Sequence, residues 1–200
     1  MIMLFKMKLI TIWMIAVCIP LQSFGEVSDP FLLSANVESG LNDQILAEYE
    51  AFYIYEHMAS YFSRPNVGLS GFANFFRKSA NEEIEHARKF SEFVNKRNSK
   101  VILKNIIEKA RTLKLPSEGV PMDFKNIHEA IDLAIDKELY VSTQINELHK
   151  LAAKMNDATT QDFLDEFLQE QVDSISKLRE MQARLRLDSS AVYLMDKELR

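Results

Sequence analysis

The sequence predicts an all-α protein: a four-helix bundle with a long crossover between the second and third helices and a short fifth helix at the C-terminus. Two observations carry this prediction. The 200-residue chain has 5 Gly and 5 Pro, and residues 72–115 and 122–200 contain neither. Because sheets need such turn residues at short intervals, long helices remain. Apolar residues also recur at alternating spacings of three and four, the pattern of helices with one buried face.

The N-terminal segment differs in composition from the rest of the chain. Lys6 and Lys8 precede an apolar run over residues 9–21, and small residues follow it. This order is typical of a secretory signal peptide. We therefore expect residues 1–25 to be a cleaved signal peptide, residues 26–200 to form one domain, and the protein to be secreted.

Removal of this segment changes the charge and the cysteine content. The chain has 24 basic and 29 acidic residues, and without the two leader lysines the balance is 22 to 29, a net charge of −7. An acidic surface disfavours nucleic acid as a partner. The single cysteine, Cys18, leaves with the leader, so the domain depends on its core. An uncleaved membrane anchor is the alternative, disfavoured because the run is short and Pro20 closes it; no membrane partner is expected.

Four long helices follow from the periodicity. Their apolar stripes cover residues 41–62, 72–93, 124–155 and 164–185. Thr159 and Thr160 are expected at the N-cap of the fourth helix, because hydroxyl side chains accept hydrogen bonds from the first free N–H groups. Residues 188–190 are a plausible cap for a short fifth helix over Ala191–Leu199.

The connection between the second and third helices, about residues 98–123, is too long for a hairpin. A crossover that runs the length of the bundle would make the first two and the last two helices parallel pairs. Within this connection, Val101–Leu115 is expected to contain a helical turn or two.

Five polar residues interrupt the apolar stripes near the middle of the helices. They are Glu48, Glu83, His86, Glu138 and Gln171. Three carboxylates that converge on one interior cannot be buried unpaired, so they must share protons or surround a positive charge. No Lys or Arg lies on the central stripes, and a metal ion would supply that charge.

The Glu-x-x-His motif formed by Glu83 and His86 places a carboxylate and an imidazole on one helical face. Such a motif supplies a bridging carboxylate and a nitrogen ligand to di-metal sites in helix bundles. The motif alone arises often by chance, but here Glu48 and Glu138 stand on neighbouring stripes. Oxygen-rich ligation with one imidazole favours iron or manganese over structural zinc. Tyr55, two turns from Glu48, is either a hydrogen-bond donor to a ligand or a core aromatic.

These residues, in this order, resemble the ferritins, specifically the heavy-chain or ferroxidase type and its secreted invertebrate forms. The similarity covers about residues 36–199. The stretches that match are LAEYEAFYIYEHMASYF, NEEIEHARKF, NELHKLA and FLQEQV. Val141 stands where a bacterioferritin would have the histidine of a second motif, which favours the ferritin branch.

The resemblance implies a diiron centre that oxidises two Fe(II) with dioxygen, followed by storage of Fe(III) as a mineral inside a twenty-four-subunit shell, alone or with a second ferritin subunit type. It assigns the five stripe residues and Tyr55 to the centre. Glu83 would bridge the two irons, Glu138 would complete the second iron site, and Gln171 would bind water or oxygen nearby.

Other acidic residues match further family features. Glu82 and Glu85 match acids that face the cavity and seed mineral, although Arg88 stands where the family often has a third acid. Asp162 and Asp165 resemble the acids that line the three-fold iron channels. The chain is one residue shorter than usual before Gln171, and a gap in the preceding turn would shift both acids off the channel positions. Residues 108–121 would be extra material on the outer surface of the shell.

Two other functions remain open at this stage. The first is a yolk or nutrient iron-storage protein in which catalysis is secondary. The second is a secreted helical-bundle signalling ligand, although such bundles rarely place three carboxylates on their seams.

Overall fold

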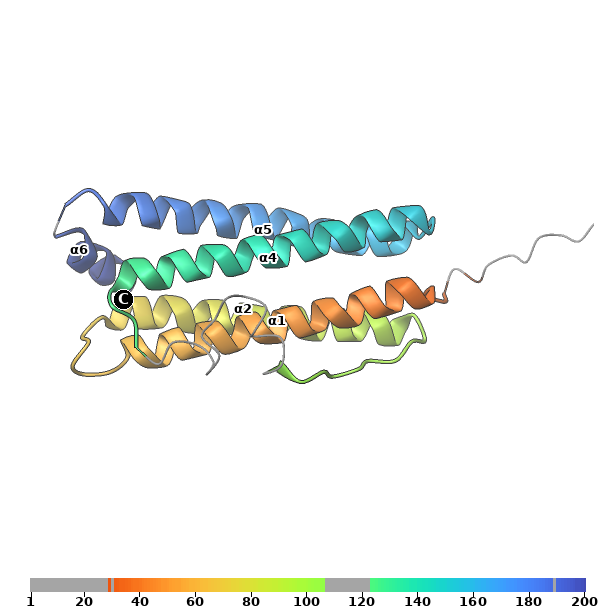
Figure 1. Cartoon of the computed structure of the whole chain (residues 1–200), viewed down its shortest axis with the longest axis horizontal. Coiled ribbons are helices and arrows are strands. Elements are labelled where there is room, and N and C mark those ends of the chain that lie inside the picture. Colours follow the sequence, from red (N-terminus) through yellow and green to blue (C-terminus); the bar gives the residue numbers. More distant parts are fainter. Residues whose placement is uncertain (1–28, 30, 107–122, 189) are drawn as a thin grey trace, which may run out of the picture.

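The computed structural model describes residues 29, 31–106, 123–188 and 190–200, and this part of the chain is helical without strands (Figure 1). The helices are α1 (Ala35–Phe62), α2 (Ser70–Lys96), α4 (Ile127–Lys154), α5 (Ala158–Leu185) and α6 (Ala191–Glu198). Their bounds enclose the four predicted stripes except for Phe124 and Met155, which flank α4. The predicted all-α bundle with a short fifth helix is confirmed.

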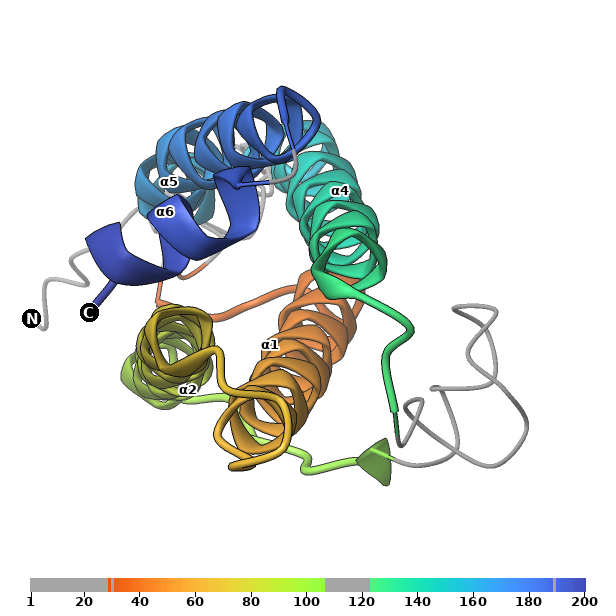
Figure 2. The same cartoon turned by 90° about the vertical axis from the view of Figure 1, so that its left-hand side faces the viewer.

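The four long helices form two antiparallel hairpins. Figure 2, an end view, shows α1 beside α2 and α4 beside α5, with α6 lying across one end of the bundle. The chain leaves α2 at one end and enters α4 at the other, so α2 and α4 run in the same direction (Figure 1). Short turns reverse the chain between α1 and α2 and between α4 and α5, so each of these two pairs is antiparallel. The expectation that the first two and the last two helices form parallel pairs is wrong.

Side-chain caps define where three of the helices begin. Ser34 Oγ accepts a hydrogen bond from Val37 N at 3.3 Å at the start of α1. Asn126 caps α4 in the same way. At α5 the cap is Asp157, which accepts from Thr160 N at 3.0 Å. The predicted threonine cap is therefore wrong by two to three residues, because the carboxylate of Asp157 already satisfies the free N–H group.

The core consists of two apolar clusters, one toward each end of the bundle. One contains Phe62, Phe76 and Ile131, and the other contains Leu41 and Phe90. On α2, α4 and α5 the predicted polar residues lie between these clusters, and on α1 Glu48 lies within the cluster that contains Leu41. Packed side chains on both sides therefore limit how far the buried carboxylates can move.

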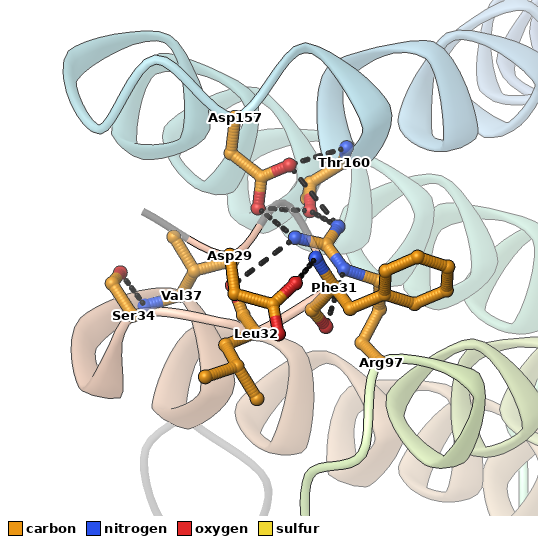
Figure 3. Close-up of polar contacts among 8 residues, drawn as sticks. All are labelled: Asp29, Phe31, Leu32, Ser34, Val37, Arg97, Asp157 and Thr160. Atoms are coloured by element: carbon orange, nitrogen blue, oxygen red, sulfur yellow. Dashed lines mark hydrogen bonds and ion pairs between the residues drawn. The ribbon is translucent and has the colours of Figure 1, made fainter. Parts of the chain in front are cut away.

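A buried arginine joins three segments at the end of the bundle where α2 ends (Figure 3). Arg97 donates to both carboxylate oxygens of Asp157, at 3.1 and 3.0 Å, and to Thr160 Oγ1 at 3.1 Å. It also donates to the carbonyl oxygens of Phe31 and Leu32. Arg97 thereby ties α2 to the α4–α5 turn and to the segment before α1.

Helix α6 docks on the first turn of α2. Asp196 is buried, and its Oδ1 accepts hydrogen bonds from Gly71 N at 2.7 Å and from Phe72 N at 3.2 Å. A Cβ atom on Gly71 would lie 1.8 Å from the backbone oxygen of Asp196, so only glycine permits this approach. The C-terminal helix thus supplies the cap that α2 lacks in its own sequence.

Several expectations concern segments outside the described residues. These are the leader over residues 1–25, the domain boundary at residue 26 and the surface insertion over residues 108–121. Residues 101–105 are not helical, and the rest of the helical turn expected within Val101–Leu115 lies almost wholly outside the described part. Among the helices that the structure describes, none has the length and apolar character needed to span a membrane.

We predict that Gly71→Ala lowers the free energy of unfolding by about 1–3 kcal/mol, because the new methyl group forces α6 away from α2. Gly40→Ala in α1 is the matched control. Its new Cβ would meet the end of the Leu148 side chain at 2.7 Å, which can rotate away more easily than backbone. Urea unfolding of both variants checks the prediction, and an equal effect at the two positions would contradict it.

Candidate metal centre

Two antiparallel helices bring three potential metal ligands together at mid-bundle. Glu48 of α1 and Glu83 and His86 of α2 each offer one atom, and these atoms all lie within 4.8 Å of one another. Glu48 and Glu83 are 0% and 5% exposed. Because Glu83 and His86 are three residues apart on one helix, they share a face that the antiparallel hairpin turns toward Glu48.

The hydrogen bonds around these carboxylates leave acceptor atoms unused. Gln44, one turn before Glu48, donates from Nε2 to Glu48 Oε1 at 2.6 Å. Within the described part of the chain, Glu48 Oε2, Glu83 Oε2 and Gln171 Oε1 are buried and have no hydrogen-bond partner. Buried acceptors without donors are costly, and a hard cation with oxygen ligands satisfies them. The residues present therefore fit a metal ion.

Glu138 lies beside this cluster and not within it. The Tyr55 hydroxyl donates a short hydrogen bond to Glu138 Oε1, and Gln171 Nε2 donates to Glu138 Oε2 at 2.9 Å. The structure thus divides the six predicted residues into a three-ligand cluster and an adjacent hydrogen-bonded group. The Tyr55 ring also stacks on Phe76 with centroids 6.2 Å apart, so Tyr55 is a core aromatic as well as the donor to Glu138. Its part at a metal centre stays a prediction.

Burial opposes ionisation of the carboxyl groups. It raises the pKa of Glu48 well above its usual value, and the nearby charge of Glu83 raises it further. Burial and the charge of Glu138 raise the pKa of Glu83 to about 8. The pKa of Glu138 is also raised, mainly by burial. A bound cation would reverse this effect, because it favours the charged form of each ligand.

A pocket of about 360 Å³ leads from the surface between α2 and α5 to the centre. It reaches Glu83 and His86, and Glu82, Glu170 and Asp173 also line it. Lys177 also lines the pocket, but the acids outnumber it, so the lining favours cations over anions.

Two residues that contact the candidate ligands were not predicted from the sequence. Glu170 Oε2 lies 2.9 Å from His86 Nε2, on the side of the ring away from Glu83. Gln44 binds Glu48 as described above. Gln44 could have been found from its position one turn before Glu48. Glu170 lies off the apolar stripe, so the heptad pattern contained no signal for it.

A buried lysine corrects one step of the sequence argument. Lys137, directly before Glu138, is 1% exposed although it lies off the stripe. Its Nζ donates to Glu50 Oε2 at 3.3 Å, and it interacts electrostatically with Glu48 and Glu83. Positive charge therefore does reach the interior. The apolar stripe did not reveal this buried lysine, because a heptad pattern marks only one face of a helix. Helix α4 packs against both α5 and α1, so side chains on two of its faces are buried.

The acids assigned to mineral nucleation are exposed on α2. Glu82 Oε1 lies 3.7 Å from Lys78 Nζ, and Glu85 forms an ion pair with Arg88. Arg88 thus neutralises a neighbour at the position where the family often has a third acid. Both acids remain candidates for nucleation.

Asp162 and Asp165 are exposed on α5, and Asp165 Oδ1 lies 3.2 Å from His149 Nε2. Helix α5 is continuous from Ala158, and Leu164 and Gln171, seven residues apart, are both buried. The helix therefore keeps its heptad register, which is the case in which these acids shift off the channel positions. Their role in a channel stays a prediction.

Residues 38–187 match the family model described as the ferritin-like domain. The chain belongs to the ferritin family. It is 39% identical over 155 residues to a chloroplastic ferritin of Malus baccata var. xiaojinensis, covering 74% of this chain and 58% of the relative. A chloroplastic ferritin of Phaseolus vulgaris is 37% identical over 75% of this chain and 57% of its own length. Ferritin-2 of Zea mays, also chloroplastic, is 38% identical over 74% of this chain and 57% of its own length. The chain thus spans somewhat over half the length of these curated ferritins.

The comparisons contradict the expected secretion of the protein. The relatives are chloroplastic plant ferritins, and nothing in them supports a secreted invertebrate type. An N-terminal address is read by a receptor and is independent of the fold, so a lysine-containing apolar leader did not identify the compartment.

We predict a pH-dependent stability difference between the metal-free wild-type ferritin and Glu83→Gln. A carboxyl group whose pKa is higher in the folded state stabilises the fold fully below its unfolded value of about 4.5, and this contribution is lost as the pH rises through about 8. The free energy of unfolding of the variant should therefore rise relative to that of the wild type between about pH 4.5 and pH 8, by at most about 1.4 kcal/mol per pH unit. Urea unfolding in the presence of a chelator measures the difference. A difference that is constant from about pH 5 to pH 8 would contradict the prediction.

Proposed function

We propose that this ferritin binds two Fe(II), oxidises them with dioxygen as a heavy-chain type subunit, and stores the Fe(III) as a mineral. The observation that carries the proposal is the cluster of the buried Glu48 and Glu83 with the partly buried His86, and Glu138 beside it. Membership of the ferritin family supports iron as the metal. Iron is here the substrate of the protein and is not a permanent cofactor.

Each residue has a distinct part in the proposed chemistry. Glu48 and His86 would hold the first iron, and Glu83 would bridge to the second. Glu138 would become the ligand of the second iron once its carboxylate turns from Tyr55 and Gln171. Each Fe(II) would give up one electron, and the two electrons, with two protons from water, would reduce one dioxygen to hydrogen peroxide. The protein supplies binding and orientation, while the irons undergo the redox change.

Carboxylate ligands also favour the product of the reaction. Hard anionic oxygen ligands interact more strongly with Fe(III) than with Fe(II), because the higher charge increases the electrostatic attraction. Oxidation at this site is therefore assisted by the same groups that bind the substrate. The acidic pocket between α2 and α5 connects the centre to the face that carries Glu82, where mineral growth would begin.

We further propose that the subunits assemble into a closed shell of the ferritin type. Large apolar side chains remain exposed on the single chain, including Tyr53 on α1, Ile102 and Leu103 after α2, and Tyr193 and Leu194 on α6. Apolar groups in such number on several faces are typical of surfaces that other subunits cover. Native mass spectrometry of the purified protein would count the subunits.

We predict that the wild-type protein oxidises Fe(II) quickly in air and that Glu83→Ala combined with His86→Ala slows this oxidation by at least about 100-fold, since two ligands of the first site are lost. The ferric absorbance reports the initial rate. Glu92→Ala combined with Lys96→Ala, at exposed positions of the same helix, is the control and should oxidise iron at the wild-type rate.

Equal rates in the wild type and the double ligand variant would exclude the assigned centre. Slow oxidation in the wild type with intact Fe(II) binding would instead favour a storage protein in which catalysis is secondary.

A further inference from the structure

Besides the contact of Arg97 with Asp157 at one end of the bundle, a buried ion pair lies next to the candidate metal centre and involves none of its ligands. Glu50 of α1 and Lys137 of α4 are 3% and 1% exposed, and Glu50 Oε2 accepts a hydrogen bond from Lys137 Nζ at 3.3 Å. The ammonium also lies over the ring of Tyr140, 4.8 Å from its centroid. The lysine is therefore held by two groups and cannot reach solvent.

Stability alone does not account for this pair. Removal of two charges from water costs as much as or more than their attraction returns, and well-packed apolar residues in their place are often neutral or stabilising. Glu50 Oε1 has no hydrogen-bond partner among the described residues, so the pair is not even fully satisfied. A buried pair of this kind is better explained by the geometry that it enforces.

The two partners stand directly beside metal ligands in the chain. Glu50 follows Glu48 by two residues, and Lys137 immediately precedes Glu138. The contact thus joins the two helices that carry the ligands of different iron positions, and it does so at the height of the centre.

The interface between these two helices contains apolar side chains of both core clusters, but α1 packs far more extensively on α2 than on α4. A further polar contact between α1 and α4, the Tyr55 hydrogen bond to Glu138, must change when Glu138 turns toward a metal ion. The Glu50–Lys137 contact contains no ligand atom, so it can persist while the ligands rearrange.

We propose that the Glu50–Lys137 ion pair is a positioning device that sets the separation of α1 and α4, and with it the distance of Glu138 from Glu48 and Glu83. The pair acts through these ligands and does not touch the metal ions. This inference rests on the proposed diiron function. It predicts that the second metal position, which needs Glu138, depends on the pair more than the first.

The test uses an assembled apoprotein and Co(II) as the probe, followed by calorimetry and by visible absorption. Comparison of Co(II) binding by the wild type and by the Glu138→Gln variant identifies the Co(II) site to which Glu138 contributes. The decisive variant is Glu50→Leu combined with Lys137→Met, which removes both charges and leaves no buried ion. We expect its affinity for Co(II) at the Glu138 site to fall by about 10-fold or more, with the first site little changed.

Two further variants separate positioning from a purely structural role. The exchange Glu50→Lys with Lys137→Glu restores the link with reversed polarity and should recover most of the lost affinity. Asp43→Leu with Lys104→Met removes an ion pair at the surface that joins α1 to the segment after α2, with 2.7 Å between Lys104 Nζ and Asp43 Oδ1, and should leave both Co(II) affinities at the wild-type value. Thermal unfolding midpoints are recorded for every variant.

Wild-type Co(II) affinity at both sites of the apolar variant overturns the proposal, whatever its thermal stability. If that variant does not assemble, the exchange variant decides: retention of both sites supports the proposal, and loss of the Glu138 site at unchanged thermal stability overturns it. A wild-type protein that neither binds Co(II) at the centre nor oxidises Fe(II) refutes the proposed function, and this inference with it.

Discussion

The main physical constraint on this structure is the burial of three carboxylates in the middle of an apolar bundle. Glu48, Glu83 and Glu138 are each at most 5% exposed, and burial raises the pKa of all three. Such a group destabilises the metal-free fold unless protons or cations compensate it. In the proposed function metal binding offsets this cost, because the same desolvation strengthens the interaction of the carboxylates with a cation.

The rest of the bundle offsets this cost and limits its effect. Two apolar clusters, one on each side of the centre, hold the helices together independently of the carboxylates. Arg97 joins three segments at one end, and Asp196 fastens α6 to α2 at the other. Because both ends are tied, the middle of the bundle can contain unsatisfied polar atoms without local unfolding.

The centre is asymmetric, and the asymmetry is functional in the proposed reaction. Glu48, Glu83 and His86 are already clustered, whereas Glu138 is held by Tyr55 and Gln171. In the proposed reaction one iron position would thus be nearly preformed, and the other would require a side-chain rotation. Preorganisation favours tight binding at the first position, and the movable ligand suits an ion that must later leave.

The long helices and their order were predictable from the sequence alone, and so were the residues proposed for the centre, because heptad periodicity and the absence of turn residues are local properties of the chain. The sequence also indicated Glu83 and His86 as one unit, since i and i+3 on a helix always share a face. Helix direction, the role of Asp157 as a cap, and the contacts of Glu170 and Lys137 were decided only by the tertiary structure. Each of these depends on which faces of different helices meet, and a side chain off the apolar stripe is buried only when a neighbouring helix covers it.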